Sequence, residues 1–226
     1  QSTAPTFPTP IAANVPTDEE FDTAPLAPPR GFRGYDGRWL FPDELNLRGI
    51  HALGMGLVTL LHDLKVDPRI SVGHDYRSYS GSIQQALMNG LMAAGAEVFD
   101  IGLALSPTAY FSQFALDVPA VAMVTASHNE NGWTGVKMGA ARPLTFGPDE
   151  MSALREIVLN GTYQARSGGS YTYVTDMRER YIADLTDRPK IKRKLKVVAA
   201  CGNGTAGIFA PAVLEGIGAE VIPLDG

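Results

Sequence analysis

The chain has a single cysteine, Cys201, among its 226 residues. An internal disulfide is therefore excluded, and this cysteine usage is typical of a reducing compartment. No apolar run approaches the roughly 20 residues needed to cross a bilayer, and the first residues lack the basic start and apolar centre of a signal peptide. We therefore expect a cytoplasmic protein with no membrane partner.

Positive charge is also scarce. The chain carries 19 lysines and arginines against 24 aspartates and glutamates, which gives a formal net charge of -5. Such a chain has no general basic field to attract nucleic acid or anionic lipid, so any recognition of phosphate must be local. With 45% hydrophobic residues, it can nevertheless bury a substantial core.

Proline is concentrated at the amino-terminal end. Seven of the 16 prolines lie in the first 29 residues, together with an acidic cluster of Asp18, Glu19, Glu20 and Asp22. This composition buries too little apolar surface to fold by itself, so we interpret residues 1–29 as an extended or disordered arm.

Amphipathic helices and short apolar strands alternate after residue 41. The predicted helices begin at Pro42 (continuing to about Leu64), at a cap of Ser80 or Ser82, at Ser106 and at Pro148. The predicted strands cover residues 69–73, 97–102, 120–126 and 136–139. This alternation predicts an α/β fold, with a layered, mostly parallel sheet and helices on both faces.

A change of composition to Gly, Ser, Thr and Tyr between Gly161 and Tyr173 indicates a domain boundary. We assign residues 30–162 to a first domain, and residues 163–226 to a linker and the first part of a second α/β domain of similar type. The sequence at 94–98, Ala-Gly-Ala-Glu-Val, is echoed at 217–221 as Ile-Gly-Ala-Glu-Val. A duplicated βαβ unit would give this echo, and so would a generic helix–glycine–strand junction.

The stretch from Val121 to Gly139 carries the strongest chemical signal. An apolar run ends at Ser127, and the polar loop that follows brings together an imidazole, two carboxamides and, further on, the ammonium of Lys137. Ligands of parallel sheets gather beyond the carboxyl ends of the strands, so this cluster suits an anionic group. An ordinary turn rich in Asn and Gly is the alternative.

Ser127 with His128 raises the question of a serine nucleophile. Adjacent residues of an extended loop point apart, so we expect His128 to be badly placed to activate its neighbour, and no Gly-x-Ser-x-Gly elbow is present. It is more coherent that Ser127 carries a phosphoryl group, with nearby donors holding its oxygens and Lys137 offsetting its charge.

Two further clusters contain arginine. Arg30, Arg33 and Arg38 could make planar, bidentate contacts to phosphate, or could pin the amino-terminal arm onto the acidic body. Asp75 and Arg77 follow a strand end, where we interpret them as a local ion pair that shapes their own loop.

A glycine loop at Gly202–Gly207 follows a predicted strand and opens a predicted helix. It fits the Gly-x-Gly-x-x-Gly dinucleotide pattern, and Asp225 lies near the distance where a ribose-binding acid is expected. An NAD-dependent oxidoreductase is therefore an alternative function. A tight turn that binds nothing would need the same glycines.

Taken together, these segments resemble the α-D-phosphohexomutase family, most closely its bacterial phosphomannomutase/phosphoglucomutase members. The resemblance is carried, in order, by Phe32–Arg38, Val72–Arg77, Thr125–Asn129, Gly135–Lys137 and Cys201–Gly204. It implies an enzyme that interconverts hexose 6-phosphate and hexose 1-phosphate through a phosphoserine and a hexose 1,6-bisphosphate intermediate, with alignment and charge neutralisation as the main demands.

The resemblance also implies roles for individual residues. Ser127 would be the phosphoserine, Lys137 the general acid or base, and His128 and Arg38 further catalytic residues. Tyr35 supports this group, and we assign Tyr35 and Asn129 to substrate or phosphate binding. In the family, Mg²⁺ is held by a phosphoserine oxygen and by three aspartates of a second-domain loop, so the phosphate on Ser127 would be a metal ligand here.

The chain departs from this pattern in several places. No Asp-x-Asp-x-Asp loop occurs in the 226 residues, and the family's third and fourth domains are not represented. We therefore expect the chain alone to be inactive and its partners to be hexose phosphates and the remaining C-terminal domains of the same protein. If those domains also lacked the aspartate loop, a noncatalytic sugar-phosphate-binding protein would be favoured. Glu130 stands where proline is usual, and Gly37 and Trp39 replace the usual neighbours of Arg38.

Overall fold

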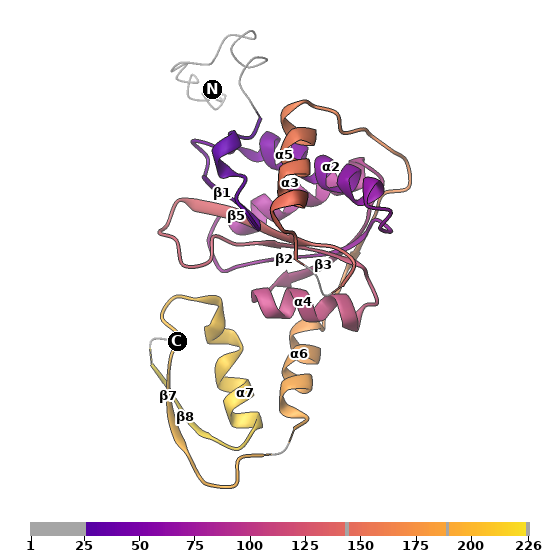
Figure 1. Ribbon diagram of the computed structural model, residues 1–226. Helices are drawn as coiled ribbons and strands as arrows, with labels where there is room; N and C mark the ends of the chain where they lie inside the picture. Colours follow the sequence, from indigo (N-terminus) through magenta and orange to yellow (C-terminus); the bar gives the residue numbers. More distant parts are fainter. Residues whose placement is uncertain (1–25, 143–144, 189, 225–226) are drawn as a thin grey trace, which may run out of the picture.

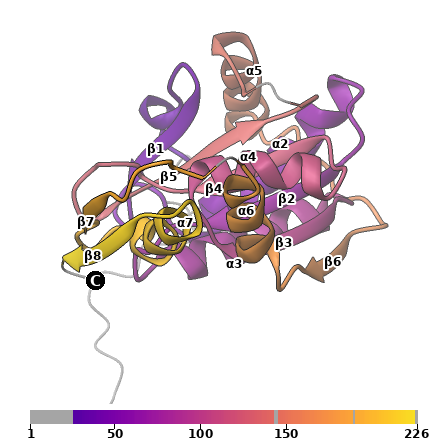
Figure 2. The same cartoon turned by 90° about the horizontal axis from the view of Figure 1, so that it is seen from below.

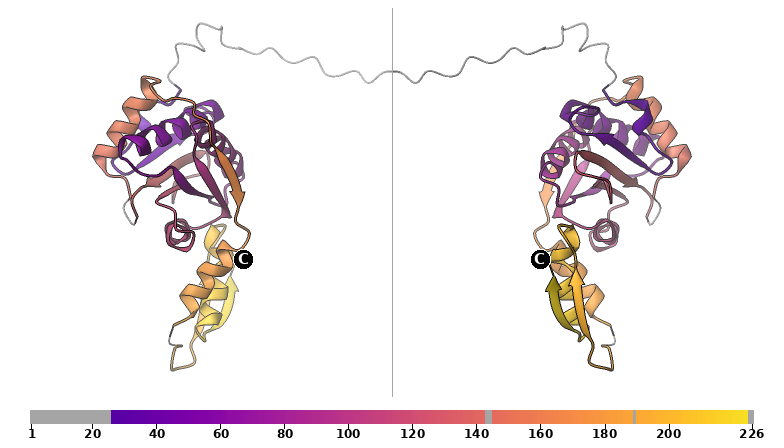
Figure 3. Two further views of the ribbon diagram at one scale, coloured as in Figure 1. Left: turned by 90° about the vertical axis from the view of Figure 1, so that its right-hand side faces the viewer. Right: turned by 90° about the vertical axis from the view of Figure 1, so that its left-hand side faces the viewer.

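A computed structural model describes residues 26–142, 145–188 and 190–224. Residues 1–25 of the predicted arm, and Asp225, lie outside the described residues. Within these ranges the chain forms a large α/β layer and a smaller unit beside it, which is reached through helix α6 (Met177–Thr186) (Figure 1). The side views of Figure 3 show the smaller unit extending away from the sheet as a separate lobe.

The large layer is built on a six-stranded sheet with the order β1-β5-β4-β2-β3-β6. Its strands are β1 (Asp36–Leu40), β2 (Arg69–His74), β3 (Glu97–Leu103), β4 (Ala120–Val124), β5 (Trp133–Gly139) and β6 (Ser170–Tyr173). The run from β4 through β2 and β3 to β6 is parallel, whereas β5 pairs antiparallel with both β4 and β1. The carboxyl ends of β2, β3 and β4 therefore meet at one edge of the sheet.

Helices cover both faces of this sheet, as the sequence predicted. Figure 1 shows α2 (Leu47–Asp63), α3 (Ser80–Ala93) and α5 (Pro148–Leu159) on one face and α4 (Ser106–Ala115) on the other. The larger apolar core lies under the first three helices, and a smaller one lies under α4. Among the described residues, no helix combines the length and apolar character required to cross a membrane.

The predicted helix start at Pro42 is wrong. Residues 41–45 form a turn in which the Glu44 and Leu45 amides donate to Leu40 O, and the Glu44 carboxylate accepts from the Leu40 amide. Helix α2 begins at Leu47, where the Asn46 side chain caps it by accepting from Gly49 N at 3.0 Å. Proline and acidic residues favour a helix start, but they also suit a turn, and here they form one.

The predicted serine cap of α3 is also wrong. The N-cap residue of α3 is Tyr79, and no side chain caps this end of the helix. Ser80 is the first helical residue, and its hydroxyl donates to Asp75 Oδ1 at 2.5 Å. The Ser80 hydroxyl thus binds the charged carboxylate of Asp75 instead of a backbone amide of its own helix.

Strand β6 shows that the main sheet continues past residue 162. It pairs in parallel with β3, and Tyr171 donates from its hydroxyl to the buried carboxylate of Asp100 at 2.9 Å. The same carboxylate accepts from Gln84 Nε2 at 2.7 Å and from Gly102 N at 2.8 Å. The division into residues 30–162 and 163–226 stays a prediction, but the segment 170–173 packs with the first sheet.

The smaller unit holds a two-stranded parallel sheet of β7 (Lys196–Ala200) and β8 (Glu220–Leu224). The short 3-10 helix η2 (Thr205–Ile208) and helix α7 (Ala210–Gly216) connect the two strands. Viewed from below in Figure 2, α6 and α7 lie across the face that carries α4. Aromatic rings join these helices, with Tyr181 centred 5.4 Å from Phe111 and 6.2 Å from Phe209.

The sequence echo has a matching backbone geometry. Gly95 and Gly218 both have positive φ angles, of 93° and 100°. In each case the glycine amide and the following alanine amide donate to carbonyls three and five residues back, which is the Schellman ending of a helix. This general helix-ending motif is sufficient to produce the repeated sequence without a duplication.

Helices α2 and α3 pack closely through glycine. A Cβ atom placed on Gly90 would lie 2.0 Å from the carbonyl oxygen of His51, so the two backbones leave no room for a side chain. We expect Gly90→Ala to lower the free energy of unfolding by about 1–3 kcal/mol, because overpacking forces the helices apart. Gly81→Ala in the same helix meets nothing within 4 Å. In urea titrations followed by circular dichroism, this control should be as stable as the wild type, and equal midpoints for both variants would contradict the packing argument.

Candidate active site

A cavity of about 800 Å³ lies where the carboxyl ends of β2, β3 and β4 face the smaller unit. Its walls come from the loop after β2 (residues 75–78), the start of α4 (104–107), the end of β4 with residues 127, 128 and 131, and the glycine loop at 203–206. The sequence placed Ser127 at such a strand end, and the structure places it on the wall of this cavity.

Ser127 has a left-handed backbone, with a φ angle of 57°. This conformation costs a residue with a Cβ atom roughly 1–2 kcal/mol, so the surrounding structure must enforce it. It also turns consecutive side chains toward each other, and Ser127 Oγ lies 3.3 Å from His128 Nδ1. The expectation that His128 would point away from Ser127 is therefore wrong, because the loop is not extended at this residue.

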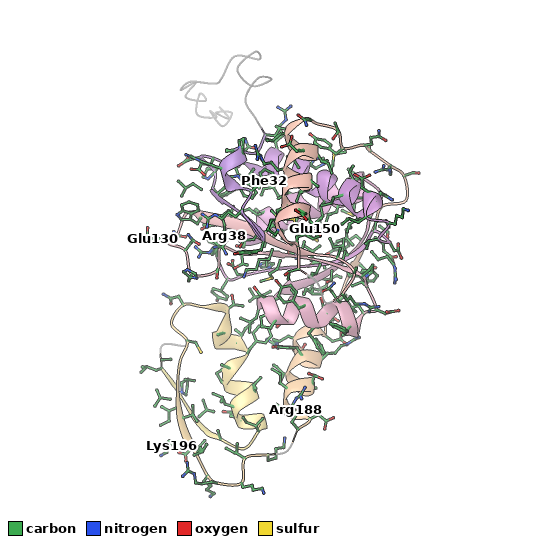
Figure 4. All side chains as sticks on the ribbon, in the orientation of Figure 1. Phe32, Arg38, Glu130, Glu150, Arg188 and Lys196 are labelled. Atoms are coloured by element: carbon green, nitrogen blue, oxygen red, sulfur yellow. The ribbon has the colours of Figure 1, made fainter. Side chains whose placement is uncertain are left out.

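We define the Ser127 loop as residues 125–132, which connect β4 to β5. Tyr79 holds its far end, since its hydroxyl donates to Trp133 O at 2.8 Å and accepts from Gly132 N at 2.9 Å. The carbonyl oxygen of Glu130 accepts from Arg77 at 2.9 Å, while the Glu130 side chain is exposed at the periphery of the molecule (Figure 4). Glutamate in place of the usual proline therefore leaves the loop's backbone contacts in place.

Arg38 holds the near side of the loop. Its guanidinium is 7% exposed and donates to Ala126 O at 2.6 Å and to Asn129 Oδ1. The other side of the same fork binds Asp36 Oδ2 at 2.8 and 3.0 Å. Figure 4 shows Arg38 beside the sheet on the same side as Glu130. Arg38 thus ties the edge strand β1 to the loop that presents Ser127.

Gly135 makes this reach possible. It lies opposite Arg38 in the antiparallel pair of β1 and β5. A Cβ atom at Gly135 would sit 2.8 Å from Arg38 Cδ and 2.2 Å from Gly37 O, so any side chain there would displace the arginine. The sequence identified Gly135 only as part of a motif, and the steric reason appears only once β1 and β5 are paired.

Lys137 lies on the same face of the sheet as Arg38. On β5 the side chains of Val136 and Met138 enter the larger core, so Lys137 points to the α4 face. There it stands between Met123 of β4 and Asp36 of β1, its register partners on either side. Met123 lines the cavity and cross-strand neighbours lie about 5 Å apart, so Lys137 stands beside a wall residue but is not itself one of the lining residues.

The other predicted binding residues lie elsewhere. Tyr35 is 71% exposed in the turn before β1 and is not on the cavity wall. The side-chain oxygen of Asn129 is occupied by Arg38, and of the two asparagines in the Ser127 loop it is Asn131 that lines the cavity. The assignments of Tyr35 and Asn129 to phosphate or substrate binding stay predictions.

The glycine loop closes the cavity from the smaller unit. Thr205 Oγ1 accepts from the Tyr76 amide at 3.0 Å, which ties this loop to the loop after β2. The loop leads into the 3-10 helix η2 rather than directly into an α-helix, and Gly202 is its one glycine with a positive φ, of 52°. The dinucleotide pattern requires an α-helix to open at this point, so the loop lacks the helix terminus that would receive a pyrophosphate.

The cavity is suited to an anion. Its ionised wall residues, Asp75 and Arg77, form an ion pair, and the His128 imidazole adds a hydrogen-bonding group. The amino-terminal end of α4, at Ser106 and Pro107, contributes the positive end of a helix dipole. About one turn after the start of α4, burial and then the Asp36 carboxylate raise the pKa of Tyr110, which keeps this hydroxyl neutral.

A metal site is not formed by the described residues. Within the ranges 26–142, 145–188 and 190–224, no group of three or more histidine, cysteine, aspartate or glutamate side chains could hold a metal ion. The residues present therefore do not fit a magnesium site by themselves. The ligand that the resemblance implies on this chain is a phosphate on Ser127, not a carboxylate.

Fold and site together define an α/β domain that presents a serine on the wall of a cavity suited to an anion. A family model for phosphoglucomutase/phosphomannomutase, alpha/beta/alpha domain I, matches residues 29–165. The phosphomannomutase/phosphoglucomutase of Pseudomonas syringae pv. tomato is 35% identical over 203 residues, which are 89% of this chain and 42% of that protein. Its counterpart from Pseudomonas aeruginosa PAO1 is 32% identical over the same shares.

A solved structure gives the same result. The phosphoglucomutase/phosphomannomutase family protein of Burkholderia thailandensis superimposes with a TM-score of 0.79 at 26% identity, over 88% of this chain and 44% of that chain. The chain belongs to the phosphoglucomutase/phosphomannomutase family. It spans less than half the length of these curated relatives.

Arg38 allows a direct test of the site's construction. We expect Arg38→Met to lower the free energy of unfolding by roughly 3 kcal/mol, because it leaves the half-buried Asp36 carboxylate without its partner. Arg33 is exposed and lies 5.8 Å above the Trp133 ring, so Arg33→Met should cost less than about 1 kcal/mol. Chemical denaturation of both variants checks this, and similar losses for the two would show that the buried fork is not what stabilises the loop.

Proposed function

We propose that this chain is the phosphoserine-bearing part of a phosphohexomutase that interconverts hexose 6-phosphate and hexose 1-phosphate. The observation that carries the proposal is the presentation of Ser127. Its hydroxyl is exposed on the wall of an anion-suited cavity, at the carboxyl end of β4, in a strained conformation that the surrounding side chains enforce. Membership of the family supports the same reaction class.

In this proposal a phosphoryl group on Ser127 Oγ is transferred to the free hydroxyl of a hexose monophosphate. The P–O bond to serine breaks, a P–O bond to the sugar forms, and the sugar hydroxyl gives up its proton. The product is a hexose 1,6-bisphosphate. This intermediate then reorients in the cavity, so that its other phosphoryl group faces Ser127. Transfer of that group to the serine restores the phosphoserine and releases the isomeric monophosphate.

We assign the proton transfer to Lys137, the register partner of the wall residue Met123, whose uncharged amine would accept the proton that the sugar hydroxyl gives up. His128 lies within 3.3 Å of the serine oxygen and can donate to it as it becomes the leaving group. Arg38 supports both by fixing the loop from β1. Tyr35 and Asn129 remain our candidates for contacts to the substrate or its phosphate.

The remaining parts of the reaction lie beyond these residues. Family resemblance implies that Mg²⁺ neutralises charge on the transferring group, and the described residues contain no ligand group for it. We therefore assign no step of the reaction to metal chemistry here. Sugar selection and the binding of the second phosphate are proposed for the further domains that the longer relatives contain.

Phosphorylation of Ser127 tests the proposal. We expect glucose 1,6-bisphosphate to add one phosphate to the protein in which this chain is joined to its further domains, and peptide mass spectrometry to locate it on Ser127. Ser127→Ala should remove both the modification and turnover, since no other group accepts the phosphoryl. Ser152→Ala provides a control that should keep both, because Ser152 is exposed on α5 and does not line the cavity. An active enzyme with an unmodified Ser127 would refute the mechanism.

The 226-residue chain by itself should not turn over. It lacks an Asp-x-Asp-x-Asp sequence, so Ser127 would have no metal partner to offset the charge of the transferring group. A coupled assay that converts glucose 1-phosphate to glucose 6-phosphate should give the same background rate for the wild-type chain and for Ser127→Ala. A rate in the wild type that disappears in Ser127→Ala would contradict this expectation.

A further inference from the structure

Asp75 occupies the junction between the ends of β2 and β4. Its backbone amide donates to Val124 O at 3.0 Å, which anchors it to the last residue of β4. Its side chain is 12% exposed, and its carboxylate accepts from Ser80 Oγ at 2.5 Å and from the Arg77 amide at 3.2 Å. A nearly buried negative charge is thus fixed directly below the Ser127 loop.

Thr125 links this carboxylate to Ser127. The threonine hydroxyl donates to Asp75 Oδ2 at 2.8 Å and accepts from the Ser127 amide at 2.9 Å. Since the hydroxyl proton is committed to a charged acceptor, a lone pair is left facing the serine amide. The orientation of the Ser127 backbone therefore follows from the position of Asp75.

Arg77 contacts the backbone carbonyl groups of the Ser127 loop. Its guanidinium donates to the carbonyl oxygens of Asn129 at 2.6 Å and Glu130 at 2.9 Å, and lies 3.5 Å from that of Ser127. Its Nε lies 3.4 Å from Asp75 Oδ2. Carbonyl oxygens left unpaired beside Ser127 would repel an incoming phosphoryl group, and a guanidinium that covers them removes this repulsion.

We propose that Asp75 and Arg77 are positioning residues of the phosphoryl-transfer site. Asp75 acts through Thr125 to hold Ser127 in its left-handed conformation, and Arg77 gathers the carbonyl oxygens of the loop so that the serine hydroxyl and His128 face the cavity. Neither side chain is assigned a contact with the transferred group. This inference rests on the proposed phosphoryl role of Ser127 and adds the device that orients it.

The chain contains a matched control for this pair. Asp67 and Arg69 have the same Asp-x-Arg spacing at the opposite end of β2, with an ion pair of 2.7 Å between Arg69 Nε and Asp67 Oδ2. Asp67 is exposed and Arg69 is half-buried, and neither lines the cavity. The same substitutions there alter an equivalent ion pair without touching the Ser127 loop.

The first measurement is amide hydrogen exchange of Ser127 in the 226-residue chain. We expect Asp75→Asn and Arg77→Lys to exchange this amide at least about tenfold faster than the wild type, while Asp67→Asn and Arg69→Lys leave its rate unchanged. If Asp75→Asn fails to fold, Thr125→Val breaks the same connection, and Thr125→Ser should restore protection. Unchanged Ser127 exchange in the folded variants would overturn the inference.

The second measurement uses kinetics in the protein that carries the further domains. We expect Asp75→Asn and Arg77→Lys to lower kcat by about 10- to 100-fold, since a small misplacement of a reacting group has effects of this size. KM for the hexose phosphate should stay within about threefold, because substrate contacts are retained. A kcat within about twofold of the wild type would count against a positioning role. Failure of wild-type Ser127 to become phosphorylated would instead contradict the proposed function. The amide exchange of Ser127 would still test whether Asp75 and Arg77 hold the loop in place.

Discussion

The backbone carbonyl groups of the Ser127 loop must find hydrogen-bond donors, and much of the site follows from this requirement. The loop leaves β4 in the middle of the sheet, where a carbonyl oxygen without a partner is costly. Two arginines supply the donors, Arg38 from β1 and Arg77 from the loop after β2. Each is held in turn by an aspartate two residues earlier, Asp36 and Asp75.

This arrangement explains how an acidic chain can present a site for anions. The net charge of -5 provides no attraction at long range. At the cavity, however, the Asp75 carboxylate is paired with Arg77, and the two arginines cover the carbonyl oxygens of Ala126, Asn129 and Glu130. His128 and the start of α4 lie on the cavity wall, and Lys137 stands beside the wall residue Met123. Local pairing of these acceptors, rather than an excess of basic residues, creates the favourable field.

The smaller unit contributes to the same cavity by a different route. The rings of Phe111, Tyr181 and Phe209 join α4 to α6 and to the segment that follows the glycine loop. Thr205 then bonds the loop after β2 at the Tyr76 amide. Apolar packing therefore joins the two units, and the Thr205 hydrogen bond ties the glycine loop to the loop after β2, so that both line the same cavity as Ser127.

The sequence by itself determined the features that depend on neighbouring residues. Periodicity located the strands, and the abrupt end of an apolar run placed Ser127 at the carboxyl end of β4. The tertiary structure decided which groups meet there, because Arg77 and Ser127 are 50 residues apart and Arg38 is 88 residues from Ala126. Asp75 and Arg77 looked like a local ion pair because their further partners, in the Ser127 loop, are at least 50 residues away in sequence. Ser80 looked like a helix cap because its contact with Asp75 depends on how the intervening loop folds. The orientation of His128 depends on the φ angle of Ser127, which the sequence did not reveal. Contacts from the ends of β1 and β2 enforce this angle, and they form only when the sheet is assembled.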